Sequence, residues 1–325
     1  MLTILFVISL TLFVWVGEHP VAAQQSGKIP RVGWLSAGSS ANEFPQKQVL
    51  EGLSAVGWFD GKNMAIDYRH AGGEAKRLAT FATELVQLNV DVIVTFSAGA
   101  AVAKKATGTI PIVMQTSQDA VRAGLVDSLA RPGGNLTGIT FLTDELSGKR
   151  LELLKETLPT ATRAAILWQS SHVDNEFLGM QATAPSLGIR LQSLEVPRPA
   201  RPNEVEGAIQ AALEGRAQAL ILAPGGFTIL HRKQIIELAA KHRLPVFSAW
   251  RIFADDGAIL TYGPDQDWAR RLAYYIDRVL KGTKPSDLPV EQPMKFELVI
   301  NLKTAKQIGV TIPPNVLVRA DRVIQ

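Results

Sequence analysis

Short runs of β-branched and aliphatic residues alternate with helical segments along this chain, and the alternation restarts near its middle. The first series of predicted strands covers residues 31–35, 64–68, 91–96, 111–115 and 136–140. After a predicted helix over residues 145–158, the second series covers residues 164–168, 190–196, 219–223, 245–248 and 258–262. Alternating strands and helices are typical of a parallel sheet covered by helices. The pattern predicts an α/β protein with two such units in tandem.

The two halves also share local details. Pro111 and Pro245 each open a strand, and Gly57 and Gly188 each follow a helix and precede the second strand of their half. A glycine directly after a helix is common because it adopts the left-handed conformation that ends the helix. We therefore expect two doubly wound, Rossmann-like lobes. A single TIM barrel, in which all the βα units close into one ring, is the alternative.

The first 23 residues have the composition of a secretory signal peptide. Residues 2–16 carry no charge, and small residues precede a cut after Ala23. This apolar run is shorter than the ~20 residues that a membrane-spanning helix needs. No Lys or Arg precedes the run, so an uncleaved membrane anchor is the alternative. We expect residues 1–23 to be a signal peptide and the remaining chain to be periplasmic.

Residue usage argues against several kinds of site. The chain contains no cysteine, which excludes disulfides, thiolate metal sites and a lipoprotein anchor. Its five histidines are scattered and form no HExxH spacing, so we expect no metal and no cofactor. The formal net charge is +4, and basic residues are interleaved with acidic ones. This distribution is typical of solvated helix faces and predicts no nucleic-acid partner.

Common catalytic motifs are also missing. No GxGxxG opens a helix after the first strand, and residues 133–138 (GGNLTG) continue with Ile139, where a phosphate-binding loop needs lysine. Residues 95–99 (TFSAG) resemble the nucleophile elbow of hydrolases but lack its first glycine. We therefore expect a binding protein and no catalytic residues. A secreted α/β enzyme remains the alternative.

Polar and aromatic residues follow the predicted strands. In open parallel sheets, ligands bind beyond the carboxyl ends of the strands. Hydroxyl groups, free N–H groups at helix starts and aromatic rings suit a small polar or aromatic solute. The candidate ligand-binding residues are Ser36, Ser39, Ser97, Ala98, Thr116, Ser117 and Asp119 in the first half, and Trp168, Pro224, Gly225, Trp250, Arg251 and Tyr262 in the second.

Several of these candidates have a simpler structural interpretation. Ser97 precedes a predicted helix and could cap it. Trp168 at the end of a strand could belong to the core. Trp250 and Arg251 could contribute packing and surface charge. Residues 131–135 (RPGGN) are expected to form a turn without a ligand role.

Five segments carry a resemblance to a known family. They are residues 57–63 (GWFDGKN), 90–94 (VDVIV), 124–138 (GLVDSLARPGGNLTG), 145–156 (ELSGKRLELLKE) and 288–305 (LPVEQPMKFELVINLKTA). They resemble the ABC-transporter substrate-binding family typified by the tryptophan/tyrosine-type periplasmic binding proteins, in the type I periplasmic-binding-protein superfamily. The segments are spread over nearly all of the chain that follows the predicted signal peptide.

The resemblance implies two lobes joined by a three-segment hinge, with crossings near residues 140–145, 262–267 and 289–293. It implies an N-terminal lobe of residues 28–141 plus 265–290 and a C-terminal lobe of residues 142–264 plus 291–325. A small-molecule solute would be buried between the lobes of a monomer. An ABC permease and an ATPase would be the partners, and the protein would contact the membrane only through the permease.

Family members of known specificity bind aromatic amino acids, which implies that Ser97 and the loop at residues 116–117 receive a carboxylate. The sequence departs from this pattern at the amine. An ammonium group needs an acidic or carbonyl partner, for which Asp119, Asp255 and Asp256 are the candidates. Arg251 would instead suit an anionic solute. We expect the solute-binding component of an importer; a sensory module that presents its ligand to a membrane receptor is the alternative.

Overall fold

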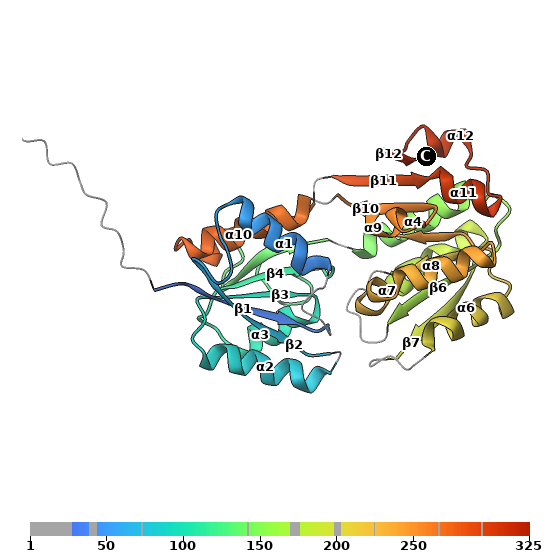
Figure 1. The fold of residues 1–325 in the computed structure, drawn as a ribbon. Helices are drawn as coiled ribbons and strands as arrows, with labels where there is room; N and C mark the ends of the chain where they lie inside the picture. Colours follow the sequence, from blue (N-terminus) through green and yellow to red (C-terminus); the bar gives the residue numbers. More distant parts are fainter. Residues whose placement is uncertain are drawn as a thin grey trace, which may run out of the picture.

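The computed structural model describes residues 28–38, 44–72, 74–141, 143–169, 176–197, 203–223, 225–265, 267–293 and 295–325. The predicted signal peptide, Ser39 and Pro224 lie outside these ranges. Two sheets with their covering helices form two lobes (Figure 1). Within the described ranges, no helix has the length and apolar character needed to cross a membrane.

The first lobe contains a five-stranded sheet in the order β2-β1-β3-β4-β5, in which every pairing is parallel. Helices α1 and α10 pack on one face of this sheet and α2 and α3 on the other. The elements are β1 (Arg31–Ser36), α1 (Phe44–Ala55), β2 (Ala65–His70), α2 (Ala75–Gln87), β3 (Val92–Phe96), α3 (Ala98–Ala106), β4 (Ile112–Thr116), β5 (Leu136–Thr140) and α10 (Asp267–Leu280).

The second lobe contains a seven-stranded sheet in the order β12-β11-β10-β9-β8-β6-β7. Only the β10–β11 pairing is antiparallel among the pairings described in this sheet. The strands are β6 (Arg163–Gln169), β7 (Arg190–Val196), β8 (Leu220–Leu222), β9 (Val246–Ser248), β10 (Leu260–Pro264), β11 (Phe296–Asn301) and β12 (Arg322–Ile324). All ten predicted strands are confirmed, with ends shifted by a few residues.

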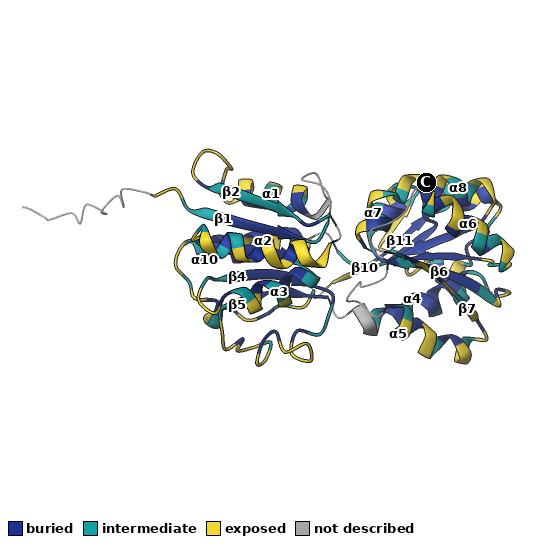
Figure 2. Ribbon diagram, turned by 90° about the horizontal axis from the view of Figure 1, so that it is seen from below, coloured by how far each residue is buried: buried dark blue, intermediate teal, exposed yellow. Residues whose placement is uncertain are grey.

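Helices cover both faces of the second sheet as well. Figure 2 shows the central strands of both sheets as mostly buried and the outer faces of the helices as exposed. The α-helices are α4 (Thr143–Thr157), α5 (Glu176–Thr183), α6 (Glu204–Glu214), α7 (Gly226–Leu230), α8 (Arg232–Lys241), α9 (Arg251–Asp255), α11 (Leu302–Ile308) and α12 (Pro314–Leu317). The expected α/β fold with two doubly wound lobes is therefore confirmed, and two separate sheets rule out a single barrel.

The chain passes between the sheets three times. It leaves the first sheet after β5, returns from β10 to α10, and leaves again between Glu291 and β11. In Figure 1 the strands of the first sheet run toward the second lobe, so their carboxyl ends lie on the side that faces it. This arrangement places the first-lobe candidate residues on the side of their sheet that faces the second lobe.

Candidate functional site between the lobes

The carboxyl ends of β1, β3 and β4 are neighbours in the first sheet. Leu35 is in register with Thr95, and Phe96 is in register with Gln115. Adjacent strands lie ~4.8 Å apart. The structure therefore brings together the chain after β1, the turn after β3 and the loop after β4, which carry the first-lobe candidates.

Ser97 forms the turn between β3 and α3 in an unusual backbone conformation. Its φ of 45° and ψ of −116° are rarely adopted by a residue other than glycine. The Ser97 amide donates to the Gln115 carbonyl at 2.8 Å, but its side chain makes no capping hydrogen bond. The capping interpretation of the Ser97 hydroxyl is therefore wrong, and this hydroxyl is half-buried without a described partner.

A close contact between β3 and α3 fixes this turn. A Cβ added at Gly99 would lie 2.0 Å from Thr95 Oγ1, whose hydroxyl donates to the Leu35 carbonyl at 2.9 Å. The absence of a side chain at Gly99 lets the start of α3 approach the strand. The first amides of a helix lack partners within the helix and carry partial positive charge, which suits an anion. Ala98 places such an amide beside Ser97.

The other first-lobe candidates are largely occupied by local bonds. Ser36 is buried, and its Oγ accepts from the Gly38 amide at 3.0 Å. Thr116 is fully buried, and its Oγ1 accepts from the Gln118 amide at 3.2 Å. Asp119 Oδ1 accepts from the amides of Val121 and Arg122 at 2.9 and 3.1 Å. Ser117 is buried in the same loop. These side chains hold the loops in place beside Ser97.

In the second lobe, Trp250 and Arg251 lie where β9 leads into α9. The Trp250 ring packs against buried clusters of both lobes, and its centroid lies 6.3 Å from that of Trp268 in α10. Arg251 Nε lies 3.6 Å from Asp255 Oδ2, and this buried nitrogen has no hydrogen-bond partner in the described part of the chain. Trp250 therefore spans the lobes, and Arg251 has an unused donor.

The remaining second-lobe candidates take part in packing. Trp168 Nε1 donates to Ser193 Oγ at 2.8 Å, and its ring stacks on Phe177 with centroids 5.6 Å apart. Tyr262 packs against Phe296, with ring centroids 6.2 Å apart. Gly225 precedes α7, and its amide donates to the Thr228 hydroxyl at 2.9 Å.

An aromatic row beside Ser97 was not predicted as part of the site. The centroid of the Trp34 ring lies 5.1 Å from that of Phe96 and 6.3 Å from that of Tyr68. Burial, followed by the Asp60 carboxylate, raises the pKa of Tyr68 to about 12. Phe96 is the last residue of β3 and is only half-buried. Side chains alternate between the two faces of a strand, and this alternation in the sequence could have placed Phe96 on the same face of the sheet as Trp34.

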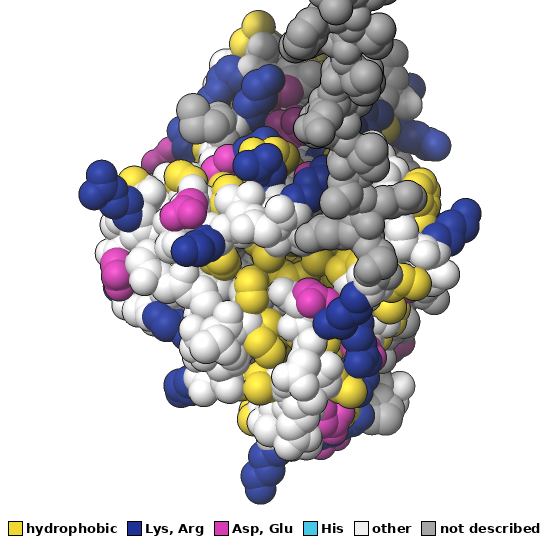
Figure 3. Space-filling view, turned by 90° about the vertical axis from the view of Figure 1, so that its left-hand side faces the viewer, with side chains coloured by type: hydrophobic (Ala, Val, Ile, Leu, Met, Phe, Trp, Pro, Cys, Tyr) yellow, Lys and Arg dark blue, Asp and Glu magenta, His cyan; other side chains and the backbone are white. Residues whose placement is uncertain are grey.

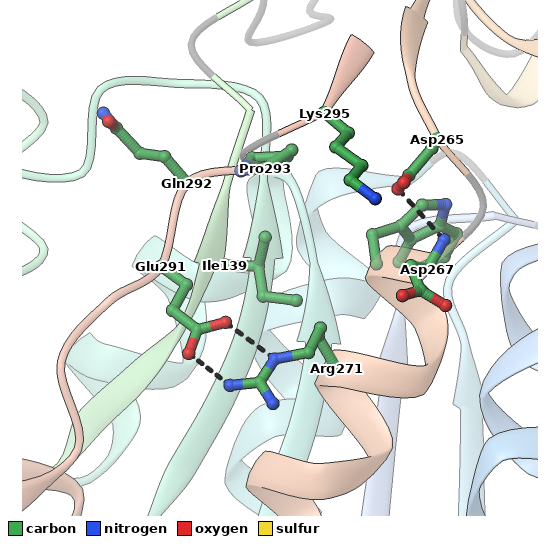
Figure 4. A pocket seen from close by; sticks show the side chains of 9 residues that line it. Ile139, Asp265, Asp267, Arg271, Glu291, Gln292, Pro293 and Lys295 are labelled. Atoms are coloured by element: carbon green, nitrogen blue, oxygen red, sulfur yellow. Dashed lines mark hydrogen bonds and ion pairs between the residues drawn. The ribbon is translucent and has the colours of Figure 1, made fainter. Parts of the chain in front are cut away.

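A pocket lies where the chain crosses between the lobes. Its lining residues are Ile139, Asp265, Asp267, Trp268, Arg271, Glu291, Gln292, Pro293 and Lys295 (Figure 4). Charged side chains surround an apolar base in which Trp268 takes part. Trp268 also meets the ring of Phe141 edge-on, with centroids 5.8 Å apart. The pocket thus belongs to the crossing segments.

Charged and metal-ligating side chains are dispersed in the part of the chain that the structure describes. On the face of the first lobe shown in Figure 3, basic and acidic side chains are scattered among one another. In the described ranges, no three His, Cys, Asp or Glu residues are grouped closely enough to hold a metal ion.

Comparison with known proteins places this geometry in a family. A model of the family described as "ABC transporter substrate binding protein" matches residues 40–324. The chain is 28% identical over 271 residues to the tyrosine-binding protein of Clostridioides difficile (strain R20291), which covers 81% of this chain and 76% of that protein.

Two solved structures are similar along most of the chain. A conserved domain protein from Vibrio cholerae has 29% sequence identity and a TM-score of 0.78, over 91% of this chain and 100% of that one. An ABC domain in complex with L-Trp from Streptococcus pneumonia has 25% identity and a TM-score of 0.76, with the same coverage of 91% and 100%. The chain therefore belongs to the ABC transporter substrate binding protein family and has the type I periplasmic-binding-protein fold.

Proposed function

We propose that this protein is the periplasmic solute-binding component of an ABC importer and that it captures an aromatic carboxylate, with L-tyrosine or L-tryptophan as the leading candidates. The family supports a solute-binding role, and two similar proteins are described as tyrosine-binding and as a complex with L-Trp. The single observation that carries the proposal is the β3–α3 turn. It offers the Ser97 hydroxyl and the first amides of α3 beside the Phe96 ring.

The candidate site offers more available hydrogen-bonding groups to a carboxylate than to an ammonium group. Of the acids considered for an ammonium group, Asp119 caps its own loop and Asp255 lies beside Arg251. Asp256 pairs with Arg232 at 2.5 Å. Arg251 Nε, by contrast, has no described hydrogen-bond partner, although it lies 3.6 Å from Asp255 Oδ2. An anion between the lobes would therefore contact Ser97 and the start of α3 from one side and Arg251 from the other.

Closure of the lobes would complete the site. A solute that contacts both lobes binds the closed form better than the open form and shifts the population toward it. Closure also removes water, which strengthens the bonds to the carboxylate. The permease would then recognise the closed form. This mechanism requires no chemical change in the solute.

Calorimetric titration with L-tyrosine, L-tryptophan and tyramine tests the proposal. Tyramine lacks only the carboxylate of tyrosine, and we expect its affinity to be at least about tenfold weaker, the loss of one or two charge-assisted hydrogen bonds. Saturable binding of tyramine as tight as that of L-tyrosine would refute the carboxylate assignment. Conversion of a bound solute into a product would indicate an enzyme.

Substitution of Ser97 separates binding from folding. Because the Ser97 hydroxyl makes no cap bond, Ser97→Ala should weaken L-tyrosine binding by about tenfold and leave the melting temperature nearly unchanged. Ser54→Ala is the matched control, since Ser54 is exposed on α1 and donates only to the Glu51 carbonyl. Equal affinities in the two variants would remove Ser97 from the site.

A further inference from the structure

The third crossing segment is bonded to the first lobe up to Glu291. The Val290 amide donates to the Leu129 carbonyl at 2.7 Å, and the Glu291 amide donates to the Gly138 carbonyl at 2.9 Å. The Thr140 amide donates in turn to the Glu291 carbonyl at 2.8 Å. These bonds form a single parallel bridge between Ile139 and Glu291 at the edge of the first sheet. An isolated bridge is prone to fray at its last residue, which is Glu291.

Two side chains of the first lobe hold the preceding residues. Thr137 Oγ1 donates to the Leu288 carbonyl at 2.6 Å, and the Tyr275 hydroxyl donates to the Pro289 carbonyl at 2.5 Å. Burial raises the pKa of Tyr275, so its hydroxyl keeps the proton that it donates. Residues 288–290 are therefore held by side chains as well as by the backbone.

An ion pair holds Glu291 itself. Arg271 Nε in α10 donates to Glu291 Oε2 at 2.9 Å, and Arg271 Nη2 donates to Glu291 Oε1 (Figure 4). The Arg271 guanidinium also lies over the Tyr274 ring, 4.6 Å from its centroid. The hydrogen bond to Glu291 raises the pKa of Arg271 further. A two-bond arginine–carboxylate pair fixes orientation as well as distance. The pair closes the bridge at the position where it would otherwise fray.

Beyond Glu291 the bonding is sparse. Between Glu291 and β11, the described hydrogen bond between the second and third crossing segments is a long one. The Asp265 amide donates to the Lys295 carbonyl at 3.3 Å. Regular pairing resumes between Pro264 and Phe296. The pocket at the crossings has walls from the first lobe, such as Ile139 and Arg271, and from residues 292, 293 and 295. A rotation of the lobes would deform this pocket.

We propose that the Arg271–Glu291 ion pair sets the pivot of the third crossing. It holds Glu291 on the first lobe, so that bending begins beyond Glu291 and the lobes open along one path. Without the pair the bridge frays at Glu291, bending extends back to Glu291 itself, and the lobes sample more orientations. A larger set of open states lowers the fraction that can bind solute. Only this last effect, on affinity, rests on the proposed function.

Hydrogen exchange measured without solute tests the pivot directly. We expect Glu291→Gln and Arg271→Gln to accelerate exchange of the Glu291 and Thr140 amides and to leave the core strands unchanged. Glu84→Gln is the matched control, because the Arg69–Glu84 pair has a similar length of 2.7 Å and similar exposure on the outside of the same lobe. Unchanged exchange at Glu291 in both variants, or equal acceleration in Glu84→Gln, would overturn the proposal.

Interlobe distances provide the second readout. The chain has no cysteine, so Thr80→Cys in α2 and Gln210→Cys in α6 accept a pair of spin labels at exposed positions. The distance distribution should broaden in Glu291→Gln and in high salt, which screens a partly exposed pair. An equally narrow distribution in all samples would contradict the pivot. Salt applied to the unmodified protein gives this comparison even if a variant fails to fold.

Affinity separates the two proposals. L-Tyrosine binding should weaken about two- to fivefold in Glu291→Gln, the range that a partly exposed ion pair supports. If the unmodified protein binds neither L-tyrosine nor L-tryptophan, the proposed solute is wrong while the exchange and distance results still decide the pivot. If binding occurs and exchange does not change, the pivot alone is wrong.

Discussion

At the scale of single residues, Ser97 combines a strained backbone with an unused hydroxyl. A positive φ at a non-glycine residue costs about 1–3 kcal/mol and persists where surrounding contacts enforce it. Here the enforcing contacts are the Ser97 amide bond to the Gln115 carbonyl and the close approach of Gly99 to Thr95. In this conformation the hydroxyl makes no capping hydrogen bond to the first turn of α3.

Replacement of Ser97 by glycine should therefore have opposite effects on stability and binding. Ser97→Gly should raise the free energy of unfolding by about 1 kcal/mol, because glycine adopts this conformation at lower cost. It should also weaken L-tyrosine binding, because the hydroxyl is lost. Urea unfolding and calorimetry measure the two effects. A less stable Ser97→Gly variant would show that the hydroxyl supports the fold.

Tyr68 provides a residue-scale prediction for pH. Its pKa is raised to about 12, first by burial and then by Asp60, whereas the unfolded chain has the ordinary value of 10.0. The unfolded state therefore loses this proton first, and the free energy of unfolding should fall as pH rises from 10 toward 12. Ultraviolet titration should show late ionisation of Tyr68, absent in Tyr68→Phe. Ionisation of Tyr68 near pH 10 in the folded protein would contradict this assignment.

At the scale of elements, the sequence pattern predicts ten of the described strands and misses β11 and β12. β11 pairs antiparallel with β10, and β12 is three residues long with two exposed side chains. β11 follows β10 only after the chain has crossed to α10 and back, and β12 is too short and exposed to form an apolar run, so the periodic pattern gave no signal for them. The strand-end rule likewise locates Ser97 and its neighbours but not Trp268. The contact between Trp250 and Trp268 depends on how the crossings place the lobes, which spacing along the chain does not encode.

The β4–β5 contact leads to a prediction at this scale. Gly138 has a φ of 136°, and an added Cβ would lie 1.9 Å from the Met114 carbonyl oxygen. Gly138→Ala should lower the free energy of unfolding by about 2–4 kcal/mol, since backbone must move in a packed sheet. Gly134→Ala is the control, because nothing lies within 4 Å of its added Cβ. Similar urea midpoints for the two variants would show that β5 can move to accommodate the added Cβ without lowering the free energy of unfolding.

At the scale of the whole molecule, the tandem pattern predicts two lobes, and the resemblance adds that a small solute lies between them. The structure supplies the contacts that relate the lobes, which are the Trp250–Trp268 pair and the crossing segment held by Arg271 and Glu291. These contacts join residues far apart in sequence. The identity of the solute follows from neither pattern, because a few side chains on loops determine it.

A crystal structure of the protein grown with L-tyrosine tests most directly whether an aromatic carboxylate binds between the lobes at Ser97. We predict density for one tyrosine between the lobes, with its ring near Phe96 and its carboxylate within hydrogen-bond distance of the Ser97 hydroxyl or the Ala98 amide. Arg251 should approach the same carboxylate from the second lobe. A solute bound elsewhere, for example against the stacked Trp168 and Phe177 rings, or a carboxylate that points into solvent, would contradict the account.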